Sequence, residues 1–356
     1  MIVHNDTIRA EKPMGYANID LAKFICALLV IIIHTSPFEN ASSVAQFYIE
    51  DVLARVAVPL FYAITGFLFF RKLTYKNGKI VRSQDNCKKL LRYCKKTAFL
   101  YLSWSFTYIV IILIPLWYRT GYWGVHLFKD CLAIILFKGT YYHLWYLLSL
   151  VYAIPLLYGL LCFFDFKKVG TIAIALWICE CLTYSYSWVG TEQITLVAFI
   201  SSRMPIIFDT LFRAVPLLTI GAFISQYQPN WHFLHKLGTA LFAFLICAFE
   251  ASILYFFSPN SGNYSYLFST PLLTFTWLLL LISTKQHNVA PQSQILLREM
   301  SLSIYCLHPM VIEILHLCGV PNGVPIWISV TLFSTGFAAG WSLWKRWLRR
   351  KLLRHS

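Results

Sequence analysis

Residues 19–35 read IDLAKFICALLVIIIHT, a hydrophobic run long enough to cross a bilayer as a helix. The run carries Lys23 near one end and His34 near the other. Ionisable side chains at membrane depth are costly, so each of them is a functional hypothesis. Eleven residues at about 100° each return the chain to nearly the same helical face, with the two side chains roughly 16 Å apart along it. The segment therefore predicts a membrane helix with a cation and a titratable base on one face.

The whole chain has the composition of a membrane protein. Hydrophobic residues make up 58% of its 356 residues and charged residues only 13%, about half the charged fraction of a soluble domain. The mean hydropathy is +0.62. We therefore predict one all-α integral membrane domain over 1–356, with a short N-terminal segment (1–17) and a basic tail (345–356). The hydrophobic runs predict about ten transmembrane helices, near 18–36, 47–70, 97–117, 144–164, 169–188, 206–226, 237–257, 266–284, 301–318 and 326–344.

The 30 Lys and Arg residues predict the orientation of these helices. If the N-terminus is cytoplasmic, 23 of the 30 lie in inner connections and 4 in outer ones, so the positive-inside rule places both termini in the cytoplasm. The net charge of +15 gathers beside the spans, which argues against nucleic-acid binding. Eight of the ten cysteines fall in apolar runs, without metal-ligand or disulfide spacing, so we expect them to pack and we expect no metal.

The inner connection 71–96 is the longest and most basic one and begins with Arg71 and Lys72. Two interpretations of it stay open and can both hold. It can anchor the protein to anionic membrane lipids, or it can be a landing surface for an anionic cytosolic cofactor. Aromatic residues at the span ends, as in Trp341, Trp344 and Trp347, fit interfacial anchoring.

The second hydrophobic run adds a cation at a depth similar to that of His34. Arg55 cannot be deprotonated and must be paired or solvated. Glu50 and Asp51 precede it as partners, just as Asp20 can pair with Lys23 one turn away in the first helix. Pro59 frees a backbone carbonyl, and Thr65-Gly66 permits close helix approach, so this helix can line a cavity.

These residues resemble the membrane-bound acyltransferase-3 family. Its first helix has a basic residue, ten intervening positions and a histidine, as in Lys23 to His34. Its second has an arginine, a VPLFF-like run and an SGF-like step, as in RVAVPLF (55–61) and TGF (65–67). Two later stretches, YHLWYL (142–147) and SLSIYCLHP (301–309), resemble its HLWF and S-x-G-I-Y-x-x-H motifs. Within the family, the chain looks like the small stand-alone O-acetyltransferases of surface glycans, such as those acting on enterobacterial common antigen.

The chain departs from the family pattern in three places. Lys23 replaces the commoner arginine, which keeps the charge but loses bidentate phosphate recognition. Thr65 replaces serine, and Ser303 stands where glycine is frequent. No hydrolase-like or racemase domain is recognisable in the chain, so we expect it to complete the transfer to the final acceptor itself.

The resemblance implies an O-acyltransferase of the bacterial cytoplasmic (inner) membrane. Its donor is cytosolic acyl-CoA, with acetyl-CoA favoured, and its acceptor is a hydroxyl of an extracytoplasmic polysaccharide or glycolipid. We expect His34 as general base, Arg55 as stabiliser of the oxyanion, and Lys23, Arg71 and Lys72 as donor-binding residues. A covalent acyl intermediate on His34 and direct transfer both stay open. The candidate cavity or acceptor residues are Glu50, Asp51, Thr65, His143, Trp145, His308 and Glu313.

Two other expectations complete the prediction. Asp209 and Arg213, one turn apart, are expected to form a structural ion pair, whereas Glu180 and Glu250 have no assigned role and could face a cavity. The competing function is a transporter or flippase for a small polar or glycolipid substrate, which would also use intramembrane charges and broken helices. The sequence predicts no oligomeric state.

Overall fold

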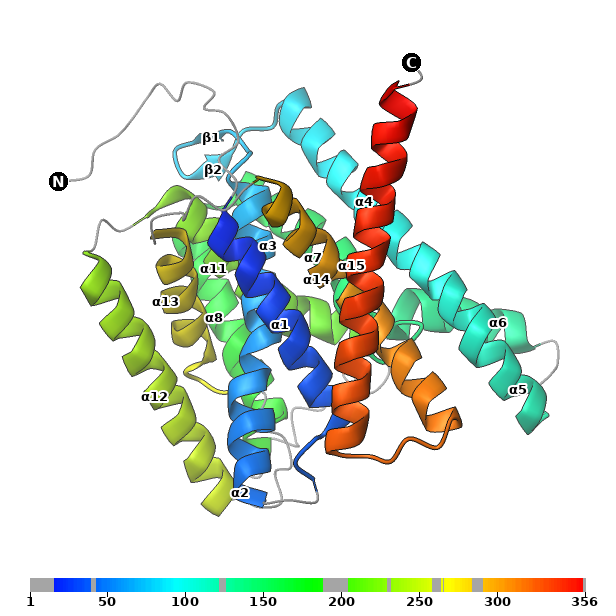
Figure 1. Ribbon diagram of the computed structural model, residues 1–356. Coiled ribbons are helices and arrows are strands. Elements are labelled where there is room, and N and C mark those ends of the chain that lie inside the picture. The colour runs from blue at the N-terminus through cyan, green and yellow to red at the C-terminus, as the bar shows by residue number, and fades with distance from the viewer. Residues whose placement is uncertain are drawn as a thin grey trace.

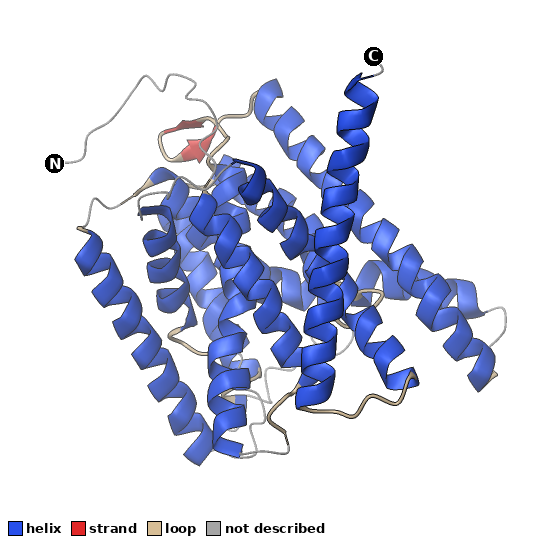
Figure 2. Ribbon diagram, in the orientation of Figure 1, coloured by secondary structure: helices blue, strands red, loops and turns tan. Residues whose placement is uncertain are grey.

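The computed structural model describes residues 16–39, 43–121, 126–187, 204–228, 232–257, 264, 266–283 and 291–354. Nearly all of the expected N-terminal segment (1–17) and of the expected outer loop 189–205 lies outside these ranges. Figure 2 shows a bundle of helices with a single short hairpin of strands. The elements are α1 (Ala17–Thr35), α2 (Ser43–Gln46), η1 (Phe47–Leu53), η2 (Ala54–Val56), α3 (Ala57–Phe70), β1 (Tyr75–Lys76), β2 (Lys79–Ile80), α4 (Gln84–Tyr108), η3 (Ile109–Leu113), α5 (Ile114–Thr120), α6 (His126–Ala133), η4 (Ile134–Lys138), α7 (Trp145–Phe163), α8 (Phe166–Thr183), α10 (Pro205–Phe208), η7 (Asp209–Ala214), α11 (Val215–Gln226), α12 (Phe233–Phe257), α13 (Thr270–Ser283), α14 (Pro291–Leu317) and α15 (Val324–Arg354).

The helical membrane architecture is confirmed, with eight described segments long and apolar enough to span a bilayer rather than the ten expected. The two other expected spans are the helices α8 and α13. Helix α8 carries Lys167, Lys168 and Glu180 within its 18 residues, and α13 has only 14 residues. The eight segments are Ala17–Thr35, Ser43–Phe70, Gln84–Arg119, Trp145–Phe163, Pro205–Gln226, His235–Phe257, Ser293–Leu317 and Val324–Leu348.

The basic connection 71–96 is more ordered than the sequence suggested. Its first part is the β1–β2 hairpin, whose turn at Asn77 and Gly78 has positive φ at both residues (51° and 71°), as a two-residue hairpin requires. Its second part is already helix α4, because the Ser83 hydroxyl accepts a hydrogen bond from the Asn86 backbone N–H at 3.2 Å and caps the helix. Many of its lysines therefore project from a helix.

The expected outer loop 118–143 also contains helix, namely α6 and η4. After Gly139, which has a φ of 84°, the chain reaches Thr140, whose hydroxyl donates to Ser105 at 2.7 Å and lies 3.2 Å from the Tyr101 hydroxyl. These contacts attach the segment before α7 to helix α4. The segment contains His143, so its position depends on α4.

Helices α3 and α11 pack against each other at the centre of the bundle. A Cβ atom added at Gly66 would lie 2.4 Å from the Leu218 carbonyl oxygen, and one at Gly221 only 2.0 Å from the Ala63 carbonyl oxygen. Glycine at both positions lets the two backbones touch, as in other membrane helix pairs. The expected close approach at Thr65-Gly66 is therefore observed, with α11 as the partner.

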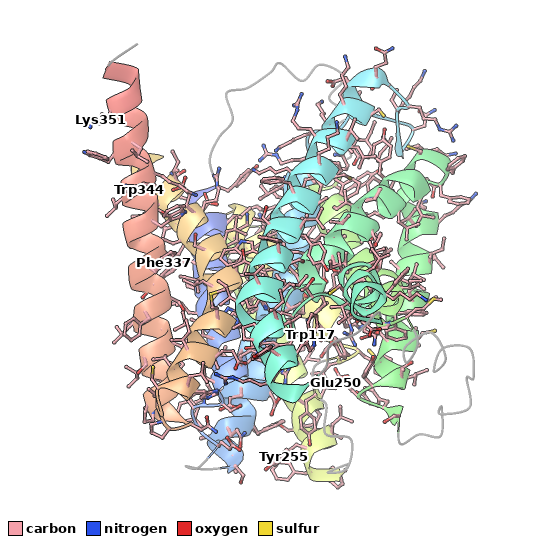
Figure 3. All side chains as sticks on the ribbon, turned by 90° about the vertical axis from the view of Figure 1, so that its right-hand side faces the viewer. Trp117, Glu250, Tyr255, Phe337, Trp344 and Lys351 are labelled. Carbon is pink, nitrogen blue, oxygen red and sulfur yellow. The ribbon has the colours of Figure 1, made fainter. Side chains whose placement is uncertain are left out.

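The ends of the described chain lie at the same end of the bundle. In Figure 1 the start of α1, the end of α15, the β1–β2 hairpin and the start of α4 lie at one end of the bundle, whereas α2 lies at the other end. Large apolar side chains face outward along α15, where Phe337, Trp344 and Trp347 are 55%, 47% and 57% exposed, and Figure 3 shows the first two along this edge. Such a surface suits lipid rather than water.

Candidate active site

A cavity of about 220 Å³ lies among the helix ends near His34. Eight elements from distant parts of the sequence surround it, namely α1, η2, α3, α7, α8, η7, α11 and α14. Its walls combine aromatic rings with a small number of polar groups, the usual character of a small-molecule site. The lining residues are Val30, Ile33, His34, Arg55, Val58, Pro59, Tyr62, His143, Trp145, Tyr146, Trp177, Arg213, Leu217, Tyr266 and Tyr305.

Four of the candidate catalytic and cavity residues predicted from the sequence line this cavity: His34, Arg55, His143 and Trp145. His34 is in the last turn of α1, with its ring 4.8 Å from that of Tyr142 and 5.4 Å from that of His308, centroid to centroid. The first helix thus brings its histidine to the same space as Arg55 from the second.

His34, His143 and His308 form a cluster of three imidazoles. The ring centroids of His143 and His308 are 5.6 Å apart. Within the described residues, neither ring nitrogen of His143 has a hydrogen-bond partner. Of the two ring nitrogens of His308, only Nδ1 has a partner in this part of the chain, the Ile304 carbonyl oxygen at 3.1 Å. Buried polar groups without protein partners are expected to bind water or ligand. In the described part of the chain, no group of His, Cys, Asp or Glu is arranged to hold a metal ion.

A tyrosine inserted into helix α14 positions the third imidazole. Pro309 has no N–H and disrupts the backbone bonds of its turn. The Tyr108 hydroxyl donates to the Cys306 carbonyl at 2.8 Å and accepts from the Met310 N–H at 3.2 Å, and so bridges a carbonyl and an N–H four residues apart. Tyr305, the residue before Cys306, donates a hydrogen bond from its hydroxyl to the backbone carbonyl of His143. The turn of α14 around Pro309 is thus tied to both α4 and the segment before α7.

Arg55 pairs with one of its two expected partners. Its Nη2 lies 3.3 Å from Asp51, while its Nε is buried without a partner among the described residues. Glu50, the other expected partner, accepts the backbone N–H of Phe38 at 3.1 Å instead. The backbone around Arg55 is π-helical and then 3-10 before Pro59, and such irregular turns are frequent at functional sites.

The remaining candidates surround the cavity without lining it. The Thr65 hydroxyl is 3.4 Å from that of Tyr146, and the Tyr141 hydroxyl donates to Glu313 at 2.5 Å. Glu250, which had no assigned role, accepts the backbone N–H groups of Phe268 and Ser269 at 2.7 and 2.9 Å. Among the candidates that are not on the cavity wall are Glu50, Asp51, Thr65, His308 and Glu313.

Sequence reasoning did not find the cavity position of Arg213. The expected ion pair with Asp209 is present at 2.5 Å, but Arg213 also pairs with Glu180 and lines the cavity. Glu180 is fully buried. Glu180 and Arg213 each lie in an apolar segment. Their charges were the only signal in the sequence that could have linked the two residues, and this signal does not say which charged residues pair.

The expected donor-binding residues gather at the other end of α1. Asp20 bonds Arg298 of α14 through both carboxylate oxygens, at 3.1 and 2.8 Å, and its charge also attracts Lys23, its expected partner. Lys23 is close enough to Arg298 and Lys72 for their charges to interact. Partial burial and neighbouring cations lower the pKa of the Lys72 ammonium; these neighbours are Arg71, Lys96, Arg298 and Lys89. We call these six residues, Lys23 included, the cationic cluster.

The cavity does not extend from His34 to the cationic cluster. Its wall on α1 begins at Val30, and Cys26 and Ala27, between Val30 and Lys23, are buried. On the facing helices the Thr65–Tyr146 contact lies at this level. The two polar ends expected on one face of α1 are both present, with packed side chains between them.

Comparisons with known proteins identify the family. A family model described as an acyltransferase domain, Acyl_transf_3, matches residues 16–347. A protein of Enterococcus faecalis named amino-acid racemase is 27% identical over 315 residues, which cover 86% of this chain and 42% of that protein. The serine/alanine racemase of Enterococcus gallinarum is 27% identical over 353 residues, which cover 95% of this chain and 48% of that protein. This chain therefore spans less than half the length of these relatives. No solved structure matches it. From the match over residues 16–347, we conclude that the chain belongs to the acyltransferase-3 family of membrane proteins.

Proposed function

We propose that this protein transfers an acyl group, with acetyl favoured, from cytosolic acyl-CoA to a hydroxyl group of a surface glycan outside the cytoplasmic membrane of a bacterium. The observation that carries the proposal is the meeting of His34 and Arg55 at one cavity, in a chain of the acyltransferase-3 family. The racemase names of the two relatives are not carried over, because this chain spans less than half of each.

The cationic cluster supports the donor side of the proposal. CoA carries phosphate groups, and ammonium and guanidinium groups are their usual partners in proteins. Burial and neighbouring cations lower the pKa of Lys72, so a bound anion would stabilise its charged form. The cluster lies at the end of the bundle where α1 begins and α15 ends (Figure 1), the end that the positive-inside rule assigns to the cytoplasm.

The residues on the cavity wall support the chemical step. His34 accepts the proton of the acceptor hydroxyl, and the oxygen of that hydroxyl attacks the thioester carbonyl. Arg55, whose Nε–H has no partner among the described residues, stabilises the negative charge that forms on the carbonyl oxygen. When the carbon–sulfur bond breaks, the CoA thiolate leaves and takes the proton from the His34 imidazolium. Transfer through an acyl-His34 intermediate would use the same groups in two steps.

The separation between the cavity and the cationic cluster sets a requirement on the donor. Lys23 and His34 are about 16 Å apart along α1, and the pantetheine arm of CoA is an extended chain that can cover such a distance. The arm has to pass the level of the Thr65–Tyr146 contact, so donor binding must displace side chains there.

The test uses purified protein in lipid nanodiscs, radiolabelled acetyl-CoA and surface glycan extracted from a strain that lacks the protein. We expect release of CoA and labelled ester on the glycan. The variant His34→Gln, which keeps the size and polarity of the side chain, should lower the rate by about 10² to 10⁴, the usual contribution of a general base, with normal membrane insertion. Accumulation of glycolipid or small solute in vesicles without CoA release would favour a transporter and refute the proposal.

A further inference from the structure

The cavity contains a second guanidinium, that of Arg213, for which the proposed chemistry has no role. Arg213 lies on η7, a π-helical turn between α10 and α11, and its side chain is 11% exposed. It could be only half of a structural ion pair. Its surroundings indicate more, because several elements hold this one group at the cavity wall.

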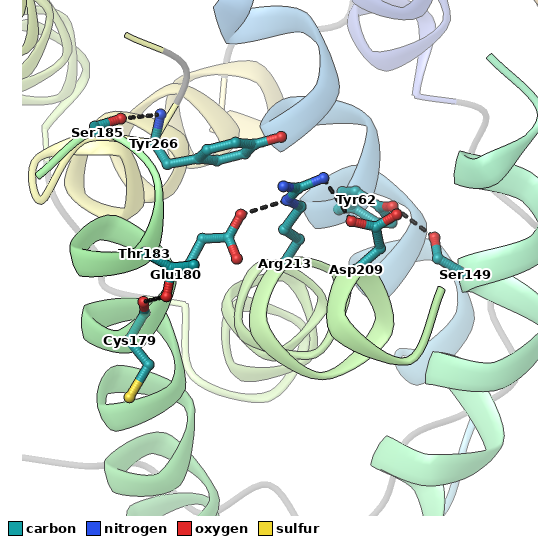
Figure 4. Close-up of polar contacts among 9 residues, drawn as sticks. All are labelled: Tyr62, Ser149, Cys179, Glu180, Thr183, Ser185, Asp209, Arg213 and Tyr266. Carbon is teal, nitrogen blue, oxygen red and sulfur yellow. Dashed lines mark hydrogen bonds and ion pairs between the residues drawn. The ribbon is translucent and has the colours of Figure 1, made fainter. Parts of the chain in front are cut away.

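The contacts of Arg213 immobilise its guanidinium. Its Nε donates to Glu180 on α8, and its Nη1 donates to Asp209 at 2.5 Å. The rings of Tyr266 and Tyr184 lie 4.2 and 4.7 Å from its Cζ atom. Figure 4 shows the guanidinium between the two carboxylates, with the Tyr266 ring beside it. A group fixed in this way loses little freedom when it binds a ligand.

The charge balance around Arg213 indicates what it can bind. Two carboxylates, from Glu180 and Asp209, face one guanidinium, so a third anion would gain little attraction and meet repulsion. A guanidinium has five N–H groups. The two carboxylates accept from two of them, and the Tyr184 hydroxyl also lies within hydrogen-bonding reach of the guanidinium. Uncharged oxygen atoms, such as those of hydroxyl groups, are the acceptors that suit the remaining N–H groups.

The aromatic walls favour the same class of ligand. The Tyr62 hydroxyl is 2.6 Å from that of Ser149, and the Trp177 Nε1–H donates to the Leu267 carbonyl at 3.0 Å. With their polar tips engaged elsewhere, these rings offer carbon faces to the cavity. A sugar ring has an apolar C–H face and a rim of hydroxyl groups, which matches such faces combined with fixed N–H donors.

The size of the cavity limits the ligand to a small unit. A volume of about 220 Å³ corresponds to about seven water molecules, at roughly 30 Å³ each in the liquid. This is room for one sugar ring, and the rest of a glycan chain would lie outside the cavity.

We propose that Arg213 and the aromatic residues around it, Tyr266 and Trp145 among them, form an acceptor subsite for a single uncharged sugar ring. Arg213 donates hydrogen bonds to a hydroxyl group other than the reacting one and thereby presents the reacting hydroxyl to His34. The inference rests on the proposed function and names the chemical class of its acceptor.

The test separates acceptor binding from stability by replacing the whole ion cluster. Buried ion triads can often be replaced by apolar residues of similar size without loss of stability. The triple variant Arg213→Met, Glu180→Leu, Asp209→Leu should therefore accumulate in membranes. With acetyl-CoA and extracted glycan, we expect its half-saturating glycan concentration to rise at least tenfold and that of acetyl-CoA to change less than twofold. Tyr266→Leu, which keeps all three charges, should show the same split. Arg119→Lys, at an exposed position on α5, is the control and should match the wild type.

A second measurement locates the new ester on the glycan by mass spectrometry and NMR. We expect it on an uncharged sugar residue. An ester on a uronic acid or another anionic sugar, or unchanged glycan saturation in both variants, would overturn the subsite while leaving the acyltransferase proposal intact. Absence of CoA release by the wild-type protein would instead refute the proposed function itself.

Discussion

The contact between α3 and α11 determines the spacing of two cavity walls, and the substitution Gly221→Ala tests this directly. The Cβ atom added at Gly221 would lie 2.0 Å from the Ala63 carbonyl oxygen, whereas Cβ atoms are not found closer than 3.0 Å to such atoms. The neighbour is backbone and cannot rotate away. The two helices must therefore separate by at least 1.0 Å, the difference between these distances.

We expect this separation to affect both stability and activity. Forcing extra volume into a packed interior costs about 1–3 kcal/mol, and the backbone clash puts Gly221→Ala at the upper end, about 3 kcal/mol. Helix α3 contributes Pro59 and Tyr62 to the cavity, and α11 contributes Leu217. A displacement of about 1 Å at reacting groups can lower the rate about 10²-fold.

The assay is thermal unfolding of purified protein, together with CoA release, for a graded series of variants. Gly66→Ala, with 2.4 Å to the Leu218 carbonyl oxygen, needs a shift of at least 0.6 Å and should be less harmful. Gly340→Ala on α15 meets nothing within 4 Å and should be neutral or stabilising, because alanine favours helix by about 1 kcal/mol over glycine. If Gly221→Ala is as stable as the wild type, or more stable than Gly66→Ala, the reasoning is wrong.

Three further predictions concern the cationic cluster and the contact of Tyr108 with α14. Lys23→Ala should raise the half-saturating concentration of acetyl-CoA about tenfold, the loss of one charge-assisted contact, with glycan saturation unchanged; an unchanged donor value would remove Lys23 from the donor site. The pKa of Lys72 is lowered by burial and neighbouring cations, so its charge is lost as the pH rises, before that of an ordinary lysine. Donor affinity should therefore fall at alkaline pH, and Lys72→Arg, which stays charged, should shift this fall to higher pH; the same pH profile in both proteins would contradict a role for the Lys72 charge. Tyr108→Phe leaves the Cys306 carbonyl and the Met310 N–H without their bridging hydroxyl, and should cost about 1–3 kcal/mol in thermal unfolding. Tyr118→Phe, at a residue that is 74% exposed, serves as its control, and equal stability of the two variants would argue against the bridge.

Much of the fold was predictable because the length of each hydrophobic run indicates, without reference to any other segment, whether that run can cross the bilayer. Helices were found at all ten expected runs, although α8 and α13 do not meet the length and charge expected of a span. The helical start of α4 at Gln84 was missed, because its lysines resemble a loop when only hydropathy is considered. Its signal was the capping residue Ser83, whose effect is local and readable in the sequence.

The partners of charged residues were harder to predict, because the sequence shows only near neighbours along one helix. It suggested Asp20 with Lys23 and Asp209 with Arg213, both within one turn. In the structure, the hydrogen-bonded ion pair of Asp20 is with Arg298, which lies 278 positions away along the chain. The second pair was correct but incomplete, since Glu180 joins it from another helix.

Two features could be read from the sequence alone: the protein is a helical membrane protein, and α1 carries a cation and a histidine on one face. Both follow from hydrophobic length and helical periodicity, which are properties of single segments. The packing of the helices adds Arg213 to the cavity that His34, Arg55 and His143 were expected to share. Only the tertiary structure decided this, and it also decided that packed side chains separate this cavity from the cationic cluster. The physical reason is that helix packing, set by close contacts such as Gly221 on Ala63, brings together residues whose separation in the sequence carries no information about their distance.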